Sequence, residues 1–453
     1  MKPPALPPPA GLPPLGPARR LLSPSVARSV LPNGLTVWVV RRPGLPLASV
    51  RLVARGGRAA DPAGRPGTAD LLAAALKEGT RSHSGRELAA ILQGAGAELA
   101  TAAGPEAIVL EAQGPAAKVR IVVDSLAEAL SAPSLPPDGV ARVRALALEE
   151  LATEETDPEF LASRAFARAV YGLHPYSVVA PERGTIEGVT PESLHVDARS
   201  LLRPERTLLV VAGDVDPDFL LTRVERRLSE WRPSGSPPPA VAEARETPGF
   251  RRILVVDRPG SVQAVLVVGR LGVSRSDPEA FPLALAMTAY GGAFTSRLVA
   301  NLRSEKGYTY SPHAVSSWLP ARGVVRTSLA VRNEVVAAAL NEVFYEMDRM
   351  GATDASEEEL DRARRRDLGL ATLRLETLRG LSAELSDLWL HGMEPEELTA
   401  YARALPRIGA VAVRSASRRW LASARALVVA VGDGRLLREE LAPFGTAEDA
   451  PSL

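Results

Sequence analysis

The sequence predicts an α+β protein made of two tandem homologous domains, each a mostly antiparallel sheet covered by helices. Two observations support this fold class. Paired strand-like segments, helices and a lone closing strand follow one another in the first half, and the same order starts again after residue 250. The closing strands, Leu208–Asp214 and Ala426–Asp433, share an apolar run that ends in Gly-Asp before a helix. We therefore favour duplication of one unit over two unrelated α+β domains.

The first block, residues 31–232, opens with strands at Leu35–Val40 and Ala48–Ala54, which a Pro43-Gly44 turn separates. Apolar residues at helical spacing then predict helices over residues 67–77, 85–93, 116–130, 136–156 and 159–171. Further strands are expected at 97–103 and 107–112. A strand at 207–214 and a helix at 217–231 close the block.

The second block, residues 251–446, repeats this opening with strands at Ile253–Val256 and Gln263–Val268. Helices are expected at Phe281–Ala289 and Phe294–Glu305, followed by strand-like segments at 308–318 and 324–331. The strand Ala426–Asp433 closes the block as its counterpart does in the first.

Two proline-rich segments lie outside the blocks. We expect residues 1–30 to form an extended arm, because the first 17 residues hold eight prolines and cannot pack as helix or sheet. The arm lacks the uninterrupted apolar stretch of a signal peptide, so the compartment stays open between cytoplasm and periplasm. Residues 233–250 carry a Pro/Ser/Gly cluster without apolar periodicity and are expected to form the linker between the blocks.

Composition excludes several kinds of function. A formal net charge of +1 argues against a nucleic-acid-binding protein, and no apolar run is long enough to predict a transmembrane helix. The absence of cysteine removes disulfides, thiol nucleophiles and Cys-based metal sites. Only five histidines are present, and no H-x-x-x-H spacing occurs among them.

Several short segments occur in the order of a known family. In the first block they are the NGL opening at 33–35, Gly56–Arg58, the helix Gly67–Thr80, Leu148–Glu150 and YGLHPY at 171–176; in the second they are YGGAFTSRLVANLRSEKGYTYS at 290–311. From about residue 31 to 446 the chain resembles the pitrilysin/insulinase-type zinc peptidases, the family of the mitochondrial processing peptidase. The resemblance implies that the two domains form half of a clamshell, whose chamber admits extended peptides.

The resemblance also locates a zinc site whose ligands are missing. Family members that hydrolyse peptides carry H-x-x-E-H on the helix at Gly67–Thr80, with a distal glutamate as third ligand. Aligned by its flanking glycines, this chain has Asp70 and Ala74 at the two histidine positions and Ala73 at the general-base position. The distal position falls on Glu149 or Glu150, and both stay open. Because alanine has neither a lone pair nor a proton acceptor, we expect no metal to be bound by this chain.

Two residues of the second block match functional positions of a zinc-less subunit. In related bacterial heterodimeric peptidases one subunit carries the zinc and the other supplies an Arg and a Tyr, which correspond here to Arg303 and Tyr310. We expect Arg303 in the last turn of a helix and Tyr310 two to three residues into the next strand, so that both can project into one cleft across the Gly307 turn. A guanidinium can donate to a substrate carbonyl, and a phenol can donate to a developing oxyanion. The alternative is an ordinary cation near a helix C-terminus and an ordinary packed tyrosine.

The sequence therefore predicts the non-zinc subunit of a heterodimeric metallopeptidase, inactive alone. The expected partner is a homologous chain that carries the zinc, and the expected substrates are peptides. Two other functions remain as alternatives. One is an inert scaffold subunit, like the core proteins of the respiratory cytochrome bc complex. The other is a module that binds peptides without cutting them.

Overall fold

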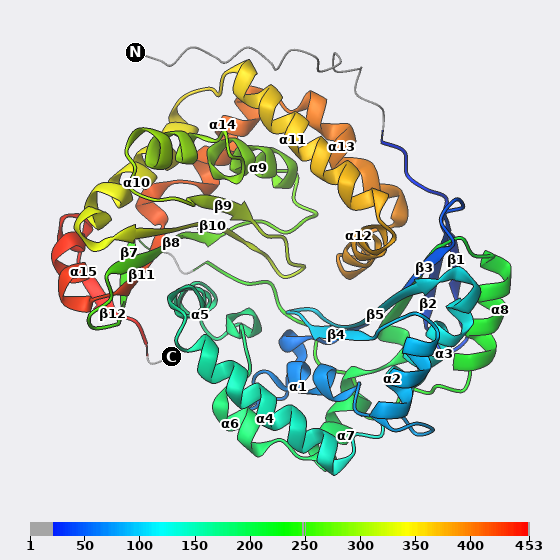
Figure 1. The fold of residues 1–453 in the computed structure, drawn as a ribbon. Helices are drawn as coiled ribbons and strands as arrows, with labels where there is room; N and C mark the ends of the chain where they lie inside the picture. Colours follow the sequence, from blue (N-terminus) through cyan, green and yellow to red (C-terminus); the bar gives the residue numbers. More distant parts are fainter. Residues whose placement is uncertain (1–20, 247–248, 250, 452–453) are drawn as a thin grey trace.

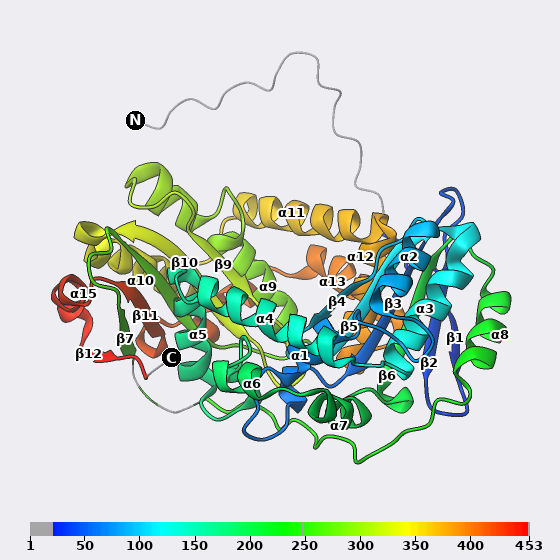
Figure 2. The ribbon, with the colours of Figure 1, turned by 60° about the horizontal axis from the view of Figure 1, so that its bottom comes forward.

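The computed structural model describes residues 21–246, 249 and 251–451, which form two α+β halves at opposite ends of a curved molecule (Figures 1 and 2). No helix in this part of the chain is long and apolar enough to cross a membrane. Each half contains one six-stranded sheet with helices on both faces.

The first sheet has the strand order β1-β2-β6-β3-β5-β4. Its strands are β1 (Ala27–Val30), β2 (Thr36–Arg41), β3 (Leu47–Arg55), β4 (Ala100–Ala103), β5 (Ala107–Pro115) and β6 (Thr207–Gly213). The helices are α1 (Thr68–Ala75), α2 (Gly85–Gly94), α3 (Val119–Ser131), α4 (Pro137–Glu154), α5 (Pro158–Tyr171), α6 (Arg183–Gly188), α7 (Pro191–Leu201) and α8 (Pro217–Leu228). Every residue of β6 is buried, which explains its unbroken apolar sequence.

The second sheet has the strand order β12-β7-β11-β8-β10-β9. Its strands are β7 (Arg252–Asp257), β8 (Gln263–Leu271), β9 (His313–Ser316), β10 (Val324–Arg332), β11 (Leu427–Gly432) and β12 (Ala447–Asp449). The helices are α9 (Ala280–Met287), α10 (Val336–Ala352), α11 (Glu357–Glu376), α12 (Leu378–Leu390), α13 (Ala400–Ala404), α14 (Ala410–Trp420) and α15 (Gly434–Leu441).

The two sheets repeat one topology. Five strands correspond in order, β2-β6-β3-β5-β4 in the first sheet and β7-β11-β8-β10-β9 in the second. Their pairing also corresponds, because β2/β6 and β7/β11 are parallel and the other pairs in these runs are antiparallel. The matching closing strands of the sequence become β6 and β11, which occupy the same position in each sheet. The predicted fold class, a duplicated α+β unit with mostly antiparallel sheets, is confirmed.

Each half covers the other half's sheet with one helix. Helix α5, from the first half, packs on the second sheet, where Phe166 lies among Val265, Val267 and Val429. Helix α12, from the second half, packs on the first sheet, with Leu385 in the same apolar cluster as Trp38 and Val210 (Figure 1). The two halves therefore share their cores through exchanged helices, and neither sheet is covered by its own half alone.

A second contact joins the halves at the YGLHPY segment. The backbone N–H of Ala321, in the turn between β9 and β10, donates to the Tyr176 hydroxyl at 3.1 Å, and Tyr176 in turn donates to Glu106. The Tyr171 hydroxyl donates to the carbonyl of Arg322 at 3.1 Å. Ala244, in the expected linker, donates its N–H to the carbonyl of Ala321 at 2.8 Å. Arg203 of the first half donates to the linker carbonyls of Ser234 and Gly235, at 2.9 and 2.7 Å, so the described part of the linker is bonded to both halves.

Three local expectations differ from the structure. Residues 27–30, which we assigned to the arm, form β1 because they continue the first sheet beside β2; residues 1–20 lie outside the described part. The helix expected at Phe294–Glu305 begins later, and its regular part is the π-helical segment Val299–Glu305. Tyr310 precedes β9 instead of lying within a strand.

Candidate functional site

Helix α1, which carries the positions of the zinc motif, has a well-defined start. Gly67 precedes the helix with φ of 88°, and a Cβ at this residue would lie 2.1 Å from the Cα of Pro181, so only glycine fits. The carboxylate of Asp61 accepts from the backbone N–H groups of Gly67 and Ala69, at 2.5 and 2.8 Å. These contacts satisfy N–H groups of the first helical turn, which have no partner within the helix.

Asp70, at the first ligand position, faces a cation from the protein itself. The Arg58 guanidinium donates to its Oδ1 at 2.7 Å, and both side chains are mostly buried, at 16% and 23% exposure. Burial raises the pKa of Asp70 from its ordinary value of 3.8 to about 6, against the lowering effect of Arg58. The carboxylate that would face a metal in this alignment is therefore already engaged.

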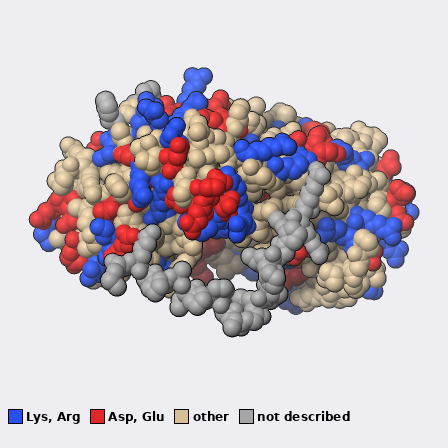
Figure 3. Space-filling view, turned by 90° about the horizontal axis from the view of Figure 1, so that it is seen from above, with Lys and Arg blue, Asp and Glu red and all other residues tan. Residues whose placement is uncertain are grey.

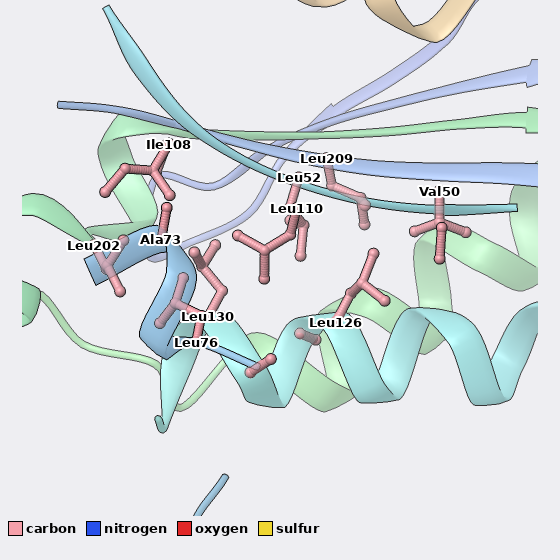
Figure 4. Packing of buried hydrophobic residues seen from close by; sticks show 14 of the residues in the cluster. Val50, Leu52, Ala73, Leu76, Ile108, Leu110, Leu126, Leu130, Leu202 and Leu209 are labelled. Atoms are coloured by element: carbon pink, nitrogen blue, oxygen red, sulfur yellow. The ribbon is translucent and has the colours of Figure 1, made fainter. Parts of the chain in front are cut away.

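The two alanines of the motif pack against the core of the first half, Ala73 buried and Ala74 half-buried. Ala73 is 1% exposed and points into the apolar core of the first half, toward Ile108 and Leu202 (Figure 4). Ala74 is half-buried against the same core. A glutamate at position 73 would place its carboxylate in this apolar environment, which is costly unless a charged or hydrogen-bonding partner is present.

Both candidates for the distal ligand lie on the exposed face of α4. The charge of Glu150 raises the pKa of Asp70 and also that of Glu154, where burial is the larger cause. The charge of Glu150 thus acts on the motif helix, while the distal position stays open between Glu149 and Glu150. Among the described residues no group of three or more His, Asp or Glu side chains could hold a metal ion. With Asp70 bound to Arg58 and methyl groups at the other two motif positions, these residues do not fit zinc.

The structure brings Arg303 and Tyr310 together and adds a third residue. The Arg303 guanidinium carbon lies 4.3 Å from the ring centre of Tyr310 and 4.8 Å from that of Phe294. Both rings are exposed, at 77% and 72%, while Arg303 is half-buried. We call these three residues the Arg303 clamp. The exposure of Tyr310 rules out the alternative of ordinary strand packing.

The segment that carries the clamp is irregular and firmly anchored. Two π-helical turns, Thr288–Gly292 and Val299–Glu305, lie on either side of Phe294. Such turns are rare and occur often at functional sites. Gly291 allows the first turn to approach β9, because a Cβ there would lie 2.6 Å from the Cβ of Ala314.

Buried polar contacts hold the second π-helical turn against its neighbours. Arg297 pairs with Glu359 of α11 through two hydrogen bonds of 2.7 and 3.2 Å. Burial would raise the pKa of Glu359, but hydrogen bonds from Arg297 and Ser356 lower it to about 2. Asn301 donates to Glu342 and Glu346 of α10, at 2.9 and 3.1 Å. The backbone at Arg303 is thus positioned by two helices.

Phe294 was missed at the sequence level as part of this site. The residue lies inside the YGGAFTSRL segment that carries the resemblance, and an aromatic residue beside two glycines is the one signal that could have drawn attention to it. The segment was expected to be a regular helix from Phe294 onward, which would have directed this ring differently. In the structure residues 293–296 form an irregular turn instead, and the ring lies against Arg303.

Comparison with known proteins identifies the family. Residues 36–178 match the family model described as insulinase (peptidase family M16), and residues 188–366 match the model described as peptidase M16 inactive domain. The chain belongs to the M16 peptidase family. As an M16 member it lacks the H-x-x-E-H residues in its first half and matches the inactive-domain model in its second. Its second half is therefore an M16 domain of the type described as inactive.

Related proteins span most of the chain. A protein of Mycobacterium leprae named "uncharacterized zinc protease" is 28% identical, over 74% of this chain and 76% of its own length. A Helicobacter pylori protein named "non-peptidase homolog" is 24% identical, over 74% and 77%. The crystal structure titled "peptidase M16 inactive domain" from Pseudomonas fluorescens covers 90% of this chain and 98% of its own, with a TM-score of 0.84 and 23% identity. This last likeness confirms the fold.

Proposed function

We propose that this chain is the non-zinc subunit of a two-chain M16 peptidase, in which a homologous partner holds the zinc and the Arg303 clamp acts on the substrate. The observation that carries the proposal is the clamp itself. Within residues 21–246, 249 and 251–451, no hydrogen bond or ion pair engages the Arg303 guanidinium. A structural arginine would be expected to use such partners.

The clamp orients Arg303 for donation. The guanidinium lies over the rings of Phe294 and Tyr310, and no described residue accepts a hydrogen bond from its N–H groups. These N–H groups suit a backbone carbonyl of a bound peptide. The hydroxyl of Tyr310, on an exposed ring, is available to donate to the oxygen that becomes negative when the peptide bond is attacked.

The degenerate zinc motif implies that the two chains of the complex have different roles. Because the residues on α1 and α4 do not fit zinc, peptide cleavage requires a partner with an intact H-x-x-E-H. This chain then contributes substrate binding and transition-state stabilisation from its second half. An inert scaffold subunit would have no need of an arginine without polar partners beside two exposed aromatic rings.

The test is cleavage of an unfolded fluorogenic peptide by the partner alone and by the two chains mixed. We expect the mixture to be active and Arg303→Gln or Tyr310→Phe to lower its kcat by roughly 10²–10³-fold. Matched controls are Arg365→Gln, an arginine 75% exposed on α11, and Tyr345→Phe, a tyrosine 54% exposed on α10. Size-exclusion chromatography checks that every variant still forms the complex.

Two outcomes would contradict the proposal. If the mixture cleaves no faster than the partner alone, the chain is not a catalytic subunit. If the mixture is active but the clamp variants match their controls, the chain acts as a scaffold instead.

A further inference from the structure

A groove of about 440 Å³ lies beside the Arg303 clamp, on the face of the second sheet that α5 covers only in part. Its floor is formed by β8 and β10, with Val267 and Arg326 among the residues that line it. Glu159 and Ser163 of α5 form one wall, and the segment that contains Tyr310 forms the other. A peptide held by Tyr310 can therefore extend directly into this groove.

Arg326, on the floor of the groove, lacks an acidic partner. Its one hydrogen bond to a described residue is a contact of 3.3 Å from Nη1 to the hydroxyl of Ser163, and no carboxylate of the described residues lies within ion-pair distance. Burial lowers the pKa of Arg326, which the more distant charge of Glu159 partly opposes. An arginine nevertheless stays protonated, so a partly buried positive charge remains without direct compensation.

The charge balance of the groove favours an anion. Arg326 and Arg332 both lie on β10, six residues apart and so on the same face of the strand, and both line the groove. Arg332 likewise has no ion pair within the described part of the chain. Glu159 is the one carboxylate in the lining. Between these charges lie small and apolar residues, which leave room for a side chain.

We infer that this groove is a subsite for a carboxylate of the bound peptide. Arg326 binds this carboxylate by donating two parallel N–H hydrogen bonds to its two oxygens. The carboxylate belongs either to an acidic side chain or to the C-terminus of the peptide, since both present the same planar pair of oxygens. The guanidinium fork matches that geometry, and the partial burial of Arg326 strengthens the pairing. The inference rests on the proposed function in one respect only, namely that the ligand is a peptide.

The experiment measures binding and not cleavage. Four fluorescein-labelled peptides of one sequence carry either Glu or Gln at an internal position, and either a free or an amidated C-terminus. Fluorescence anisotropy with the purified full chain gives a Kd for each. We expect loss of the recognised carboxylate to weaken binding about tenfold, as for a charge-assisted bidentate contact. The peptide pair that shows the difference identifies the source of the carboxylate.

Two variants connect the preference to the groove. Arg326→Gln should abolish the difference between the peptides, while Arg365→Gln on α11 should leave it unchanged. Glu159→Gln removes the competing acid and should tighten binding of the carboxylate peptide. This exposed residue also offers a second test in case Arg326→Gln fails to fold, which thermal unfolding would reveal.

The inference is overturned if the unmodified chain binds all four peptides equally, or if the preference persists in Arg326→Gln. A complex without peptidase activity would contradict the proposed function but not the subsite, because the binding measurement needs no partner.

Discussion

Arg58 and Asp70 form a mostly buried ion pair at the first position of the motif helix. The guanidinium supplies the positive charge that the carboxylate needs in a mostly buried position. Burial raises the pKa of Glu154 nearby, and the charge of Arg58 partly opposes that rise. Such a pair is not a source of large net stability, because its desolvation offsets much of the attraction. The pair balances the charge of Asp70 with a cation from the protein itself.

The pH dependence of stability tests this arrangement. Burial raises the pKa of Asp70 to about 6 in the folded state, above its ordinary value of 3.8. Between about pH 4 and 6 the folded state binds more protons at this residue than the unfolded state, so stability falls as pH rises through that window. We expect Asp70→Asn, which cannot ionise, to lose this component. Urea unfolding of both proteins from pH 4 to 7 should show the variant gaining stability relative to the unmodified chain; a constant difference would contradict the expectation.

The contact between the Arg303 guanidinium and the Phe294 ring leads to a second prediction. Phe294→Ala should lower the kcat of the two-chain complex by about two- to fivefold, because an exposed cation–π contact contributes about 0.5–1 kcal/mol. Phe219→Ala, at an aromatic 48% exposed on α8, is the matched control. Steady-state kinetics checks both; an effect of the same size in the two variants would indicate a general loss of packing.

At the scale of single elements, helix boundaries followed from the sequence and fine helix geometry did not. Predicted helices at 85–93 and 159–171 correspond closely to α2 and α5, since capping residues and prolines mark their starts. The π-helical turn Val299–Glu305 was expected as an ordinary helix, because the apolar spacing of so short a segment does not distinguish the two. This is why Tyr310 and Phe294 were placed wrongly or missed, although Arg303 was located.

The sequence of an amphipathic helix also does not show which sheet its apolar face packs against. Leu161, Ala162, Ala165 and Phe166 indicate that α5 has a buried face, but nothing in their spacing says that this face meets the second sheet. The same holds for α12 and the first sheet. The exchange of helices depends on the loops that lead into them, and it became apparent only in three dimensions.

Removing one buried side chain from an exchanged helix tests its contribution. Leu385 is fully buried between α12 and the first sheet, so Leu385→Ala should lower the free energy of unfolding by about 2–5 kcal/mol. Leu373→Ala, at a leucine 61% exposed on α11, should change it by less than about 0.5 kcal/mol. Equilibrium denaturation measures both, and equal effects would contradict the packing described for α12.

At the scale of the whole molecule, the sequence was sufficient to predict the duplication but not the order of the strands within each sheet. The similar endings Leu208–Asp214 and Ala426–Asp433 become equivalent central strands, β6 and β11. Charged residues of α11 form ion pairs within the helix, Arg362 with Glu358 and Arg364 with Asp361. Acidic and basic side chains are interspersed on the face seen in Figure 3. The sequence pattern alone could not show whether the two domains are stable independently of each other.

Separating the halves tests that independence. Residues 1–246 expressed alone would expose the apolar face of the first sheet that Trp38, Val40 and Val210 present to α12. We expect this half to aggregate, and likewise residues 247–453 without α5. Co-expressed, the two should assemble and co-purify through a tag on either one. Two separately stable, monomeric halves by size-exclusion chromatography would contradict the interlocked core.

The exchanged helices also set the order in which this protein can be completed during translation. The first sheet has all its strands once β6 leaves the ribosome, yet the helix that covers one of its faces is synthesised much later. Through that interval a nascent chain carries an uncovered apolar surface, a state prone to aggregation. We therefore expect chains that stop before α12 to aggregate, with the face of the first sheet around Trp38 and Val210 uncovered.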